Sequence, residues 1–228
     1  MIDGAASTRI PARGKHTLTA TLGCTHTTVE SMQVTPQDPL DLDPVDDQLV
    51  VPIEAAESLQ LDDAVTIPSS GVGFVPAGVS ARLDSVVATT VVVVGAASES
   101  VGAGPAVVDL SDHPFPEPST SDVGTAHLTD PLGCTGMKVN ARILHPAQHV
   151  PYHTEGTQEE LFVPVQGPAS MLIAGEAIDT PVGTVTRVAP AVPRSALNPG
   201  ETDAIWVMVG APPTGGPDDW DPGATILE

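Results

Sequence analysis

Lysine is almost absent from this chain, which contains only Lys15 and Lys138. In total, 8 Lys and Arg residues stand against 29 Asp and Glu residues, so that the formal net charge of the 228 residues is −21. Because phosphate binding requires clustered basic side chains, this excess of acid argues against a nucleic-acid partner. Such an acidic surface suits a medium near molar salt, where charges are screened over about 3 Å. We therefore interpret the chain as a protein of halophilic type.

Long hydrophobic runs are also missing. The longest candidate, residues 86–97, falls short of the roughly 18 apolar residues that a membrane helix needs. The first residues lack the basic and apolar parts of a signal peptide, and we expect a cytoplasmic protein without a membrane partner. The two cysteines, Cys24 and Cys134, have no metal-binding spacing, so we expect buried free thiols rather than a disulfide.

Stretches suited to long helices are scarce, because 24 Pro and 21 Gly interrupt the chain at short intervals. Between them lie short runs rich in Val and Thr, such as residues 27–34, 48–53, 137–144 and 160–165. Strands of this length and spacing are typical of β-sandwiches and closed barrels. The fold class is therefore predicted to be all-β.

An internal repeat relates the two halves of the chain. The sequence Leu-Gly-Cys-Thr at residues 22–25 returns at residues 132–135, and three further blocks recur in the same order. The later blocks begin at Leu49 and Leu161, at Phe74 and Val188, and at Val91 and Trp206. Because chance is a poor explanation for four blocks in one order, the repeat predicts two similar β-barrels in one chain.

These blocks define the predicted domains. We assign residues 1–97 to an N-terminal barrel and residues 126–212 to a C-terminal barrel. Residues 98–125 are rich in Pro, Ser and Asp and are expected to form a linker that carries one strand near 106–110. The segment 213–228 is expected to be a loosely packed tail.

Titratable side chains are concentrated in residues 153–160, next to the strand predicted at 160–165. Here one imidazole and three carboxylates occur within eight residues. His153 and Glu155 are two positions apart, so on a strand they would point in the same direction. Together with Glu160 they form a chemically sound ligand set for a divalent cation. Gln158 lies at the turn before the strand, where it could lean toward the same site.

These residues resemble the motifs of the cupin superfamily, in particular the bicupins, which have two barrels in one chain. The first cupin motif has the pattern Gly, His-x-His, Glu, Gly, and the second contains Pro, His and Asn. The positions that match the two motifs are Ala147, His153, Glu155, Glu160 and Gly167, then Gly183, Pro190, Arg194 and Asn198. The resemblance implies two jelly-roll barrels, each built from two antiparallel sheets, with the site in the C-terminal barrel. The N-terminal barrel lacks the motif histidines and is expected to be degenerate.

The resemblance also implies a metal site, but with two departures. Metal-binding cupins use two His and one Glu of the first motif and one His of the second. This chain keeps His153 and Glu160, has Glu155 in place of the second His, and has Arg194 in place of the last. The implied ligands are thus His153, Glu155 and Glu160, for Mn, Fe, Ni or Zn. Because a guanidinium cannot coordinate a metal, the alternative is an inward ion pair of Arg194 with Glu160, to which His153 hydrogen-bonds.

Three functions remain open at this point. The first is the binding of a small anionic metabolite, without a specified reaction. The residues expected to bind it are His153, Glu155, Gln158, Glu160 and Arg194. The second is a metal-dependent enzyme of dioxygenase, isomerase or hydrolase type. The third is a structural or storage-like bicupin whose pocket has no activity. A small molecule is the expected partner in the first two cases, and a homodimer is left open. The neighbouring His145 and His149 are expected at the rim.

Overall fold

The computed structural model of the chain describes residues 2–11, 13–42, 45–62, 65–98, 104–112, 115 and 123–214, and the backbone of residues 217–221. The helices in these residues are two short turns, α1 (Thr19–Leu22) and α2 (Thr129–Leu132). Within the same described ranges, none is long and apolar enough to cross a membrane. The remaining elements are strands in antiparallel sheets, which confirms the predicted all-β class.

Two antiparallel sheets make up most of the N-terminal half. Their strands are β2 (Lys15–Thr17), β3 (Thr27–Val34), β4 (Leu40–Leu42), β5 (Asp47–Ile53), β6 (Leu59–Leu61), β7 (Val65–Ile67), β8 (Gly71–Val75), β9 (Ala81–Ser85), β10 (Thr89–Ala96) and β11 (Ala106–Asp109). The larger sheet has the order β11-β8-β5-β10-β3-β2, and the smaller sheet has the order β4-β9-β6-β7.

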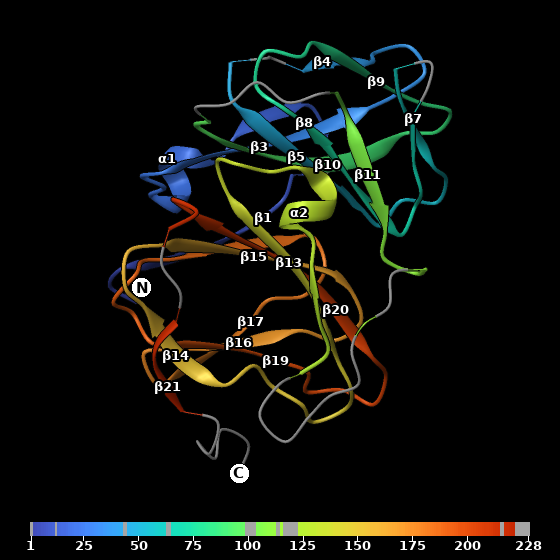
Figure 1. The fold of residues 1–228 in the computed structure, drawn as a ribbon. Coiled ribbons are helices and arrows are strands. Elements are labelled where there is room, and N and C mark those ends of the chain that lie inside the picture. Colours follow the sequence, from blue (N-terminus) through green and yellow to red (C-terminus); the bar gives the residue numbers. More distant parts are fainter. Residues whose placement is uncertain are drawn as a thin grey trace.

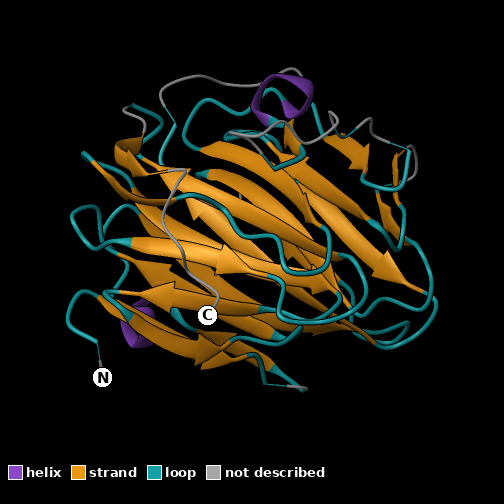
Figure 2. Cartoon of the chain, turned by 90° about the horizontal axis from the view of Figure 1, so that it is seen from below, coloured by secondary structure: helices purple, strands orange, loops and turns teal. Residues whose placement is uncertain are grey.

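A second pair of sheets, the C-terminal sheet pair, follows in the other half. Its strands are β1 (Ala5–Arg9), β12 (Thr125–His127), β13 (Lys138–Leu144), β14 (Tyr152–Glu155), β15 (Glu159–Gln166), β16 (Ser170–Ile173), β17 (Glu176–Asp179), β18 (Thr184–Val188), β19 (Arg194–Leu197), β20 (Ala204–Ala211) and β21 (Pro217–Asp221). The six-stranded sheet has the order β1-β18-β15-β20-β13-β12, and the five-stranded sheet has the order β17-β16-β19-β14-β21. The strands lie in stacked layers (Figure 2).

Two strands pair outside the simple division into halves. The first strand of the chain, β1, pairs with β18 at the edge of the C-terminal six-stranded sheet, with Ala5 opposite Val188. The strand β11, from the segment predicted as a linker, pairs with β8 at the edge of the N-terminal sheet (Figure 1). The boundaries near residues 97, 125 and 212 stay a prediction, and any division of the chain must account for these two strands.

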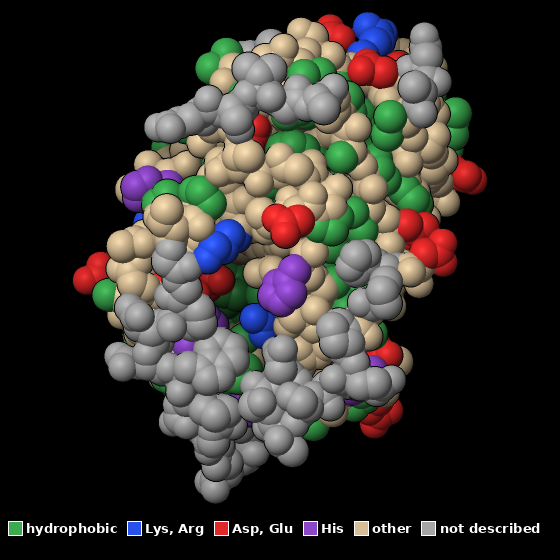
Figure 3. Space-filling view, viewed as in Figure 1, with side chains coloured by type: hydrophobic (Ala, Val, Ile, Leu, Met, Phe, Trp, Pro, Cys, Tyr) green, Lys and Arg blue, Asp and Glu red, His purple; other side chains and the backbone are tan. Residues whose placement is uncertain are grey.

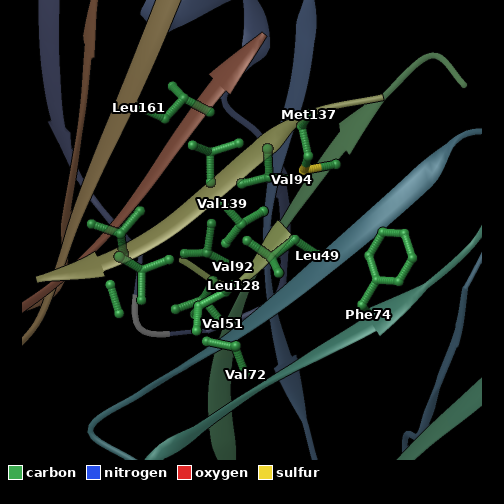
Figure 4. Close-up of a cluster of buried hydrophobic side chains, with 14 of the residues drawn as sticks. Leu49, Val51, Val72, Phe74, Val92, Val94, Leu128, Met137, Val139 and Leu161 are labelled. Atoms are coloured by element: carbon green, nitrogen blue, oxygen red, sulfur yellow. The ribbon is translucent and has the colours of Figure 1, made fainter. Parts of the chain in front are cut away.

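Side-chain alternation along the central strands separates three hydrophobic cores. On β15, Leu161 and Val163 belong to a cluster shared by both halves, whereas Phe162 belongs to the interior of the C-terminal sheet pair. A third cluster fills the space between the two N-terminal sheets. In the shared cluster, Val94 of β10 packs with Val139 of β13 (Figure 4). Because both faces of these strands are covered, they read as continuous apolar runs in the sequence.

The repeated Leu-Gly-Cys-Thr sequence forms the end of each helical turn. Gly23 follows α1 with φ of 67°, and Gly133 follows α2 with φ of 71°. Glycine adopts this left-handed conformation without the penalty that a Cβ atom brings, and it ends both turns in the same way. Cys24 and Cys134 are both free thiols, with Cys134 buried and Cys24 half-buried.

Candidate functional site

His153 lies on β14 with its imidazole almost completely buried. Its Nδ1 atom is 2.8 Å from the carbonyl oxygen of Pro151. A carbonyl oxygen only accepts, so Nδ1 must carry a proton, and in the neutral imidazole Nε2 then offers a lone pair. This Nε2 atom is 3.7 Å from Oε1 of Glu155 and 3.6 Å from Oε2 of Glu160. The tautomer thus presents a metal-ligand atom to two carboxylates.

The two carboxylates reach His153 from adjoining strands. Glu155 is two positions further along β14, and Glu160 is the second residue of β15, on the same face as Phe162 of the interior cluster. One ligand atom from each of His153, Glu155 and Glu160 lies within 4.8 Å of the other two. The structure therefore brings together the three residues whose spacing predicted a cation site.

Arg194 lies on β19 directly opposite His153 and is completely buried. Its Nε donates to Oε2 of Glu160 at 3.0 Å, and its Nη1 donates to the carbonyl oxygens of Pro190 and Val192 at 2.8 and 2.9 Å. The guanidinium is thus held in place on three sides, and the inward ion pair predicted with Glu160 is present. Its Nη2 atom is buried and has no hydrogen-bond partner.

The two site carboxyl groups have different electrostatic surroundings. Burial and the charge of Glu160 raise the pKa of Glu155 to about 7, although His153 and Arg194 oppose this shift. Burial would also raise the pKa of Glu160, but the contact with His153 and the charge of Arg194 outweigh it, so that the pKa of Glu160 is lowered. Near neutral pH, Glu160 is therefore ionised and Glu155 is only partly ionised. Perturbed carboxyl groups of this kind are typical of functional sites.

Gln158 anchors the loop between β14 and β15. Its Nε2 donates to the carbonyl oxygen of Pro212 at 2.7 Å, and its amide lies against Gly210. A Cβ atom at Gly210 would come within 3.1 Å of Gln158 Oε1, so glycine leaves room for this amide. The predicted role of Gln158 in ligand binding stays a prediction.

The two histidines predicted at the rim have partners of their own. The Nδ1 of His145 lies 2.8 Å from Oδ1 of Asp203, and the Nδ1 of His149 lies 3.0 Å from the carbonyl oxygen of Val150. The first contact ties the loop before β14 to Asp203, whereas the second stays within that loop. The described residues contain one metal-ligand cluster of three or more side chains, and it includes neither histidine.

Sequence reasoning missed two basic side chains on β13. Lys138 and Arg142 alternate with the interface residues Val139 and Ala141, and they share the parity of Leu144, which lies in the interior cluster. The charge of Lys138 lowers the pKa of Glu155, and that of Arg142 lowers the pKa of Glu160. In the view of Figure 1, the surface has a hollow with basic, acidic and histidine side chains around it (Figure 3). The sequence did contain a signal for these two side chains. Strand alternation places them on the face opposite Val139 and Ala141, and any basic residue is notable in a chain with so few of them.

The cluster fits a divalent cation. The Oε2 atom of Glu155 is buried and has no hydrogen-bond partner, and Arg194 contacts only one of the two oxygens of Glu160. A buried carboxylate oxygen without a partner is costly, and a cation would satisfy it. One imidazole nitrogen with two carboxylates suits manganese, iron or zinc. The equivalent of Glu160 in the other half is Gln48, because Gln48 pairs with Gly95 as Glu160 pairs with Gly210.

Comparison with protein-family models finds no match, and comparison with curated proteins finds none either. Solved structures do match, and among them are several structures of oxalate decarboxylase from Bacillus subtilis. One is the enzyme at pH 4.6, with a TM-score of 0.67 and 10% identity, over 96% of this chain and 78% of that one. Another comes from work on its Mn(II) centres, with a TM-score of 0.66 and 11% identity, over 93% and 77%. A single-residue variant reaches a TM-score of 0.69 at 10% identity, over 96% and 79%.

At this level of identity the likeness shows the fold. The chain has the all-β jelly-roll fold of the cupin type, as the motif resemblance implied. Its particular features within that fold are the His153, Glu155 and Glu160 cluster and the buried Arg194.

Proposed function

We propose that the C-terminal sheet pair binds a divalent cation through His153, Glu155 and Glu160 and, next to it, a small anionic metabolite. The observation that carries the proposal is the convergence of the three ligand atoms within 4.8 Å, with the proton of the imidazole on its far nitrogen. A bound cation would neutralise two carboxylates that otherwise repel each other in a buried site.

Arg194 is compatible with this cation. Its Nε donates only to Oε2 of Glu160, and its Nη1 donates to backbone carbonyl oxygens. The guanidinium is therefore held in a fixed position at the side of the site. The remaining Nη2 is a buried donor without a partner. An anionic oxygen at this point would gain a charge-assisted hydrogen bond.

The distribution of basic side chains supports an anionic ligand. The whole chain has 8 Lys and Arg residues, and Lys138, Arg142 and Arg194 act on the charges of this one cluster. In a protein with a net charge of −21, an anion meets repulsion over most of the surface. The positive charges of these three side chains offset that repulsion at the site.

Manganese is the first metal to test. The solved structures with this fold include one from work on Mn(II) centres of oxalate decarboxylase, although 11% identity carries only the fold. A divalent cation in this position would polarise an anionic oxygen or lower the pKa of a bound water. Whether a reaction follows is a separate question from binding.

The test is calorimetric titration of chelator-treated protein with Mn(II). We expect one ion per chain for the parent protein and no measurable binding for His153→Ala. The matched control is His127→Ala, because His127 is exposed on β12 and pairs with Asn140. Equal binding by the two variants, or none by the parent, would overturn the proposal.

The second candidate is an anion site without a metal, and the Arg194–Glu160 ion pair favours it because the site already contains a cation. The two candidates differ in their response to chelation. We expect small carboxylates to raise the melting temperature only when Mn(II) is present. A shift that persists in excess chelator would replace the metal site with the metal-free one.

A further inference from the structure

Glu159 is a buried carboxylate that faces away from the proposed metal site and toward the N-terminal half. It is completely inaccessible to solvent. Its oxygens accept hydrogen bonds from the backbone N–H groups of Thr25, His26 and Thr27 at 2.8–3.2 Å and from two threonine hydroxyl groups at 2.9 and 3.1 Å. Arg187 of β18 adds two further bonds, at 3.1 and 2.9 Å. We call this set of contacts the Glu159 clamp.

An equivalent contact exists in the opposite direction. Asp47, the first residue of β5, accepts hydrogen bonds from the N–H groups of Thr135 and Gly136 at 3.1 and 3.0 Å, and from Ala77 of its own half at 3.0 Å. Glu159 is the first residue of β15, the equivalent strand. Each Leu-Gly-Cys-Thr repeat therefore supplies donors to a carboxylate of the other half. We call the second set the Asp47 clamp.

The Glu159 clamp is directly connected to the proposed metal site. Glu159 and Glu160 are consecutive on β15, so their side chains point to opposite faces of the sheet. The strand begins at Glu159, and the pairing of β15 with β18 starts at Glu160. The contacts of Glu159 therefore fix the strand end from which Glu160 projects. In the N-terminal half, the residue that follows Asp47 is Gln48. It does not belong to the metal-ligand cluster found among the described residues.

We propose that Glu159 is a positioning residue for the metal site, so that the N-terminal half, through residues 25–27, controls how tightly the C-terminal sheet pair holds its cation. This inference rests on the proposed function. Residues that orient metal ligands from behind typically contribute about 10–100-fold to metal affinity. The same chain supplies an internal control, because the Asp47 clamp joins the same two halves without touching the site.

The experiment compares Glu159→Gln with Asp47→Asn in the full-length chain. We expect Glu159→Gln to weaken Mn(II) binding about 10-fold and to change the electron paramagnetic resonance spectrum of the bound ion. Asp47→Asn should lower the melting temperature by an amount similar to that of Glu159→Gln. It should leave the Mn(II) affinity and the spectrum of the bound ion unchanged. Equal effects of the two variants on affinity would overturn the inference, because both would then act only through stability.

A milder pair keeps the test valid if the charge-removing variants fail to fold. Thr25→Val removes one hydroxyl from the Glu159 clamp, and Thr135→Val removes the equivalent hydroxyl from the Asp47 clamp. We expect a several-fold loss of Mn(II) affinity only for Thr25→Val. The same loss in both variants, or in neither, would count against a positioning role.

A metal-free measurement separates this inference from the proposed function. Amide hydrogen exchange of the chelator-treated protein should be faster over residues 156–162 in Glu159→Gln and unchanged there in Asp47→Asn. If the parent binds no Mn(II), the proposed function fails, and the exchange rates alone decide whether Glu159 positions this strand end. Unchanged exchange in Glu159→Gln would overturn the positioning role in either case.

Discussion

The Nε atom of Arg194 lies 3.0 Å from Oε2 of Glu160, and the guanidinium is completely buried beside it. Arginine stands at the position where the cupin motif resembled by this sequence has a histidine. One carboxylate oxygen is thereby occupied by a fixed cation, while the second oxygen and the neighbouring Glu155 stay available. We therefore expect the affinity of the proposed site for metal to depend on this one guanidinium.

Replacing the guanidinium with an imidazole should strengthen metal binding. We expect Arg194→His to raise the affinity for Mn(II), because it removes a positive charge and adds a ligand. The melting temperature should fall, since the carbonyls of Pro190 and Val192 lose their donor at a cost of about 1–3 kcal/mol each. Calorimetry and thermal melting measure the two effects. Arg82→His, on an exposed arginine, is the control, and an affinity gain no larger than in this control would contradict the prediction.

Protonation of Glu155 should make both stability and metal binding depend on pH. Its pKa of about 7 lies above the value of 4.5 for an unperturbed glutamate, so its ionisation opposes folding. The stabilising effect of the protonated form is complete below about pH 4.5 and is lost as the pH rises through 7. We expect Glu155→Gln to be more stable than the parent at pH 8 by on the order of 2–3 kcal/mol, with little difference at pH 4.5.

Urea denaturation at several pH values measures this difference, with the exposed Glu176→Gln as the control. Metal binding should show the opposite dependence, because the ligand must be deprotonated. The Mn(II) affinity of the parent should therefore increase between pH 6 and pH 8. A stability difference that is the same at every pH would exclude Glu155 as its source.

The Cys134 thiol should be inert in the native protein. Burial and the charge of Asp47 raise its pKa to about 12, and the nucleophilic thiolate is then a minute fraction at pH 8. We expect iodoacetamide to modify Cys134 only after denaturation. Cys24 is the internal reference, since it is half-buried and should react first. Rapid labelling of Cys134 in the native protein, as measured by peptide mass spectrometry, would refute this.

Salt should stabilise the fold. With a net charge of −21, repulsion between surface carboxylates extends over about 10 Å at 0.1 M salt and over about 3 Å at 1 M. The melting temperature is therefore expected to rise between 0.1 and 2 M KCl. Sodium chloride at the same ionic strength checks for ion-specific effects. A melting temperature that stays constant or falls would remove the basis for the halophilic interpretation.

Local patterns predicted a large part of the fold and the cluster of His153, Glu155 and Glu160. The apolar run at 160–165 corresponds to β15, and the two-residue spacing of His153 and Glu155 places both on one face of β14. These predictions succeeded because strand formation and side-chain alternation depend on neighbouring residues. The ion pair of Arg194 with Glu160 could be predicted because the second motif supplied the position of its cation.

Contacts between distant segments could not be predicted in this way. Glu159 was one of three acidic residues in the cluster, and nothing in its neighbours indicated a partner 134 positions earlier at Thr25. The Leu-Gly-Cys-Thr repeat indicated a relation between the two halves, but its role as a donor for Glu159 and Asp47 depends on how the halves pack. Likewise, the pairing of β1 with β18 has no local signal, since an edge strand needs only a compatible pattern.

The position of β1 has a consequence for synthesis of the protein. Ser7 and Thr186 are 179 positions apart, and their hydroxyl groups are 2.9 Å apart across adjacent strands. At a translation rate of about 5–20 residues per second, β18 leaves the ribosome roughly 10–40 s after β1. During that interval β1 lacks the strand with which it pairs in the folded protein. The C-terminal six-stranded sheet is therefore completed only after β18 and β20 have both emerged from the ribosome, although its outermost strand is the first strand to be synthesised.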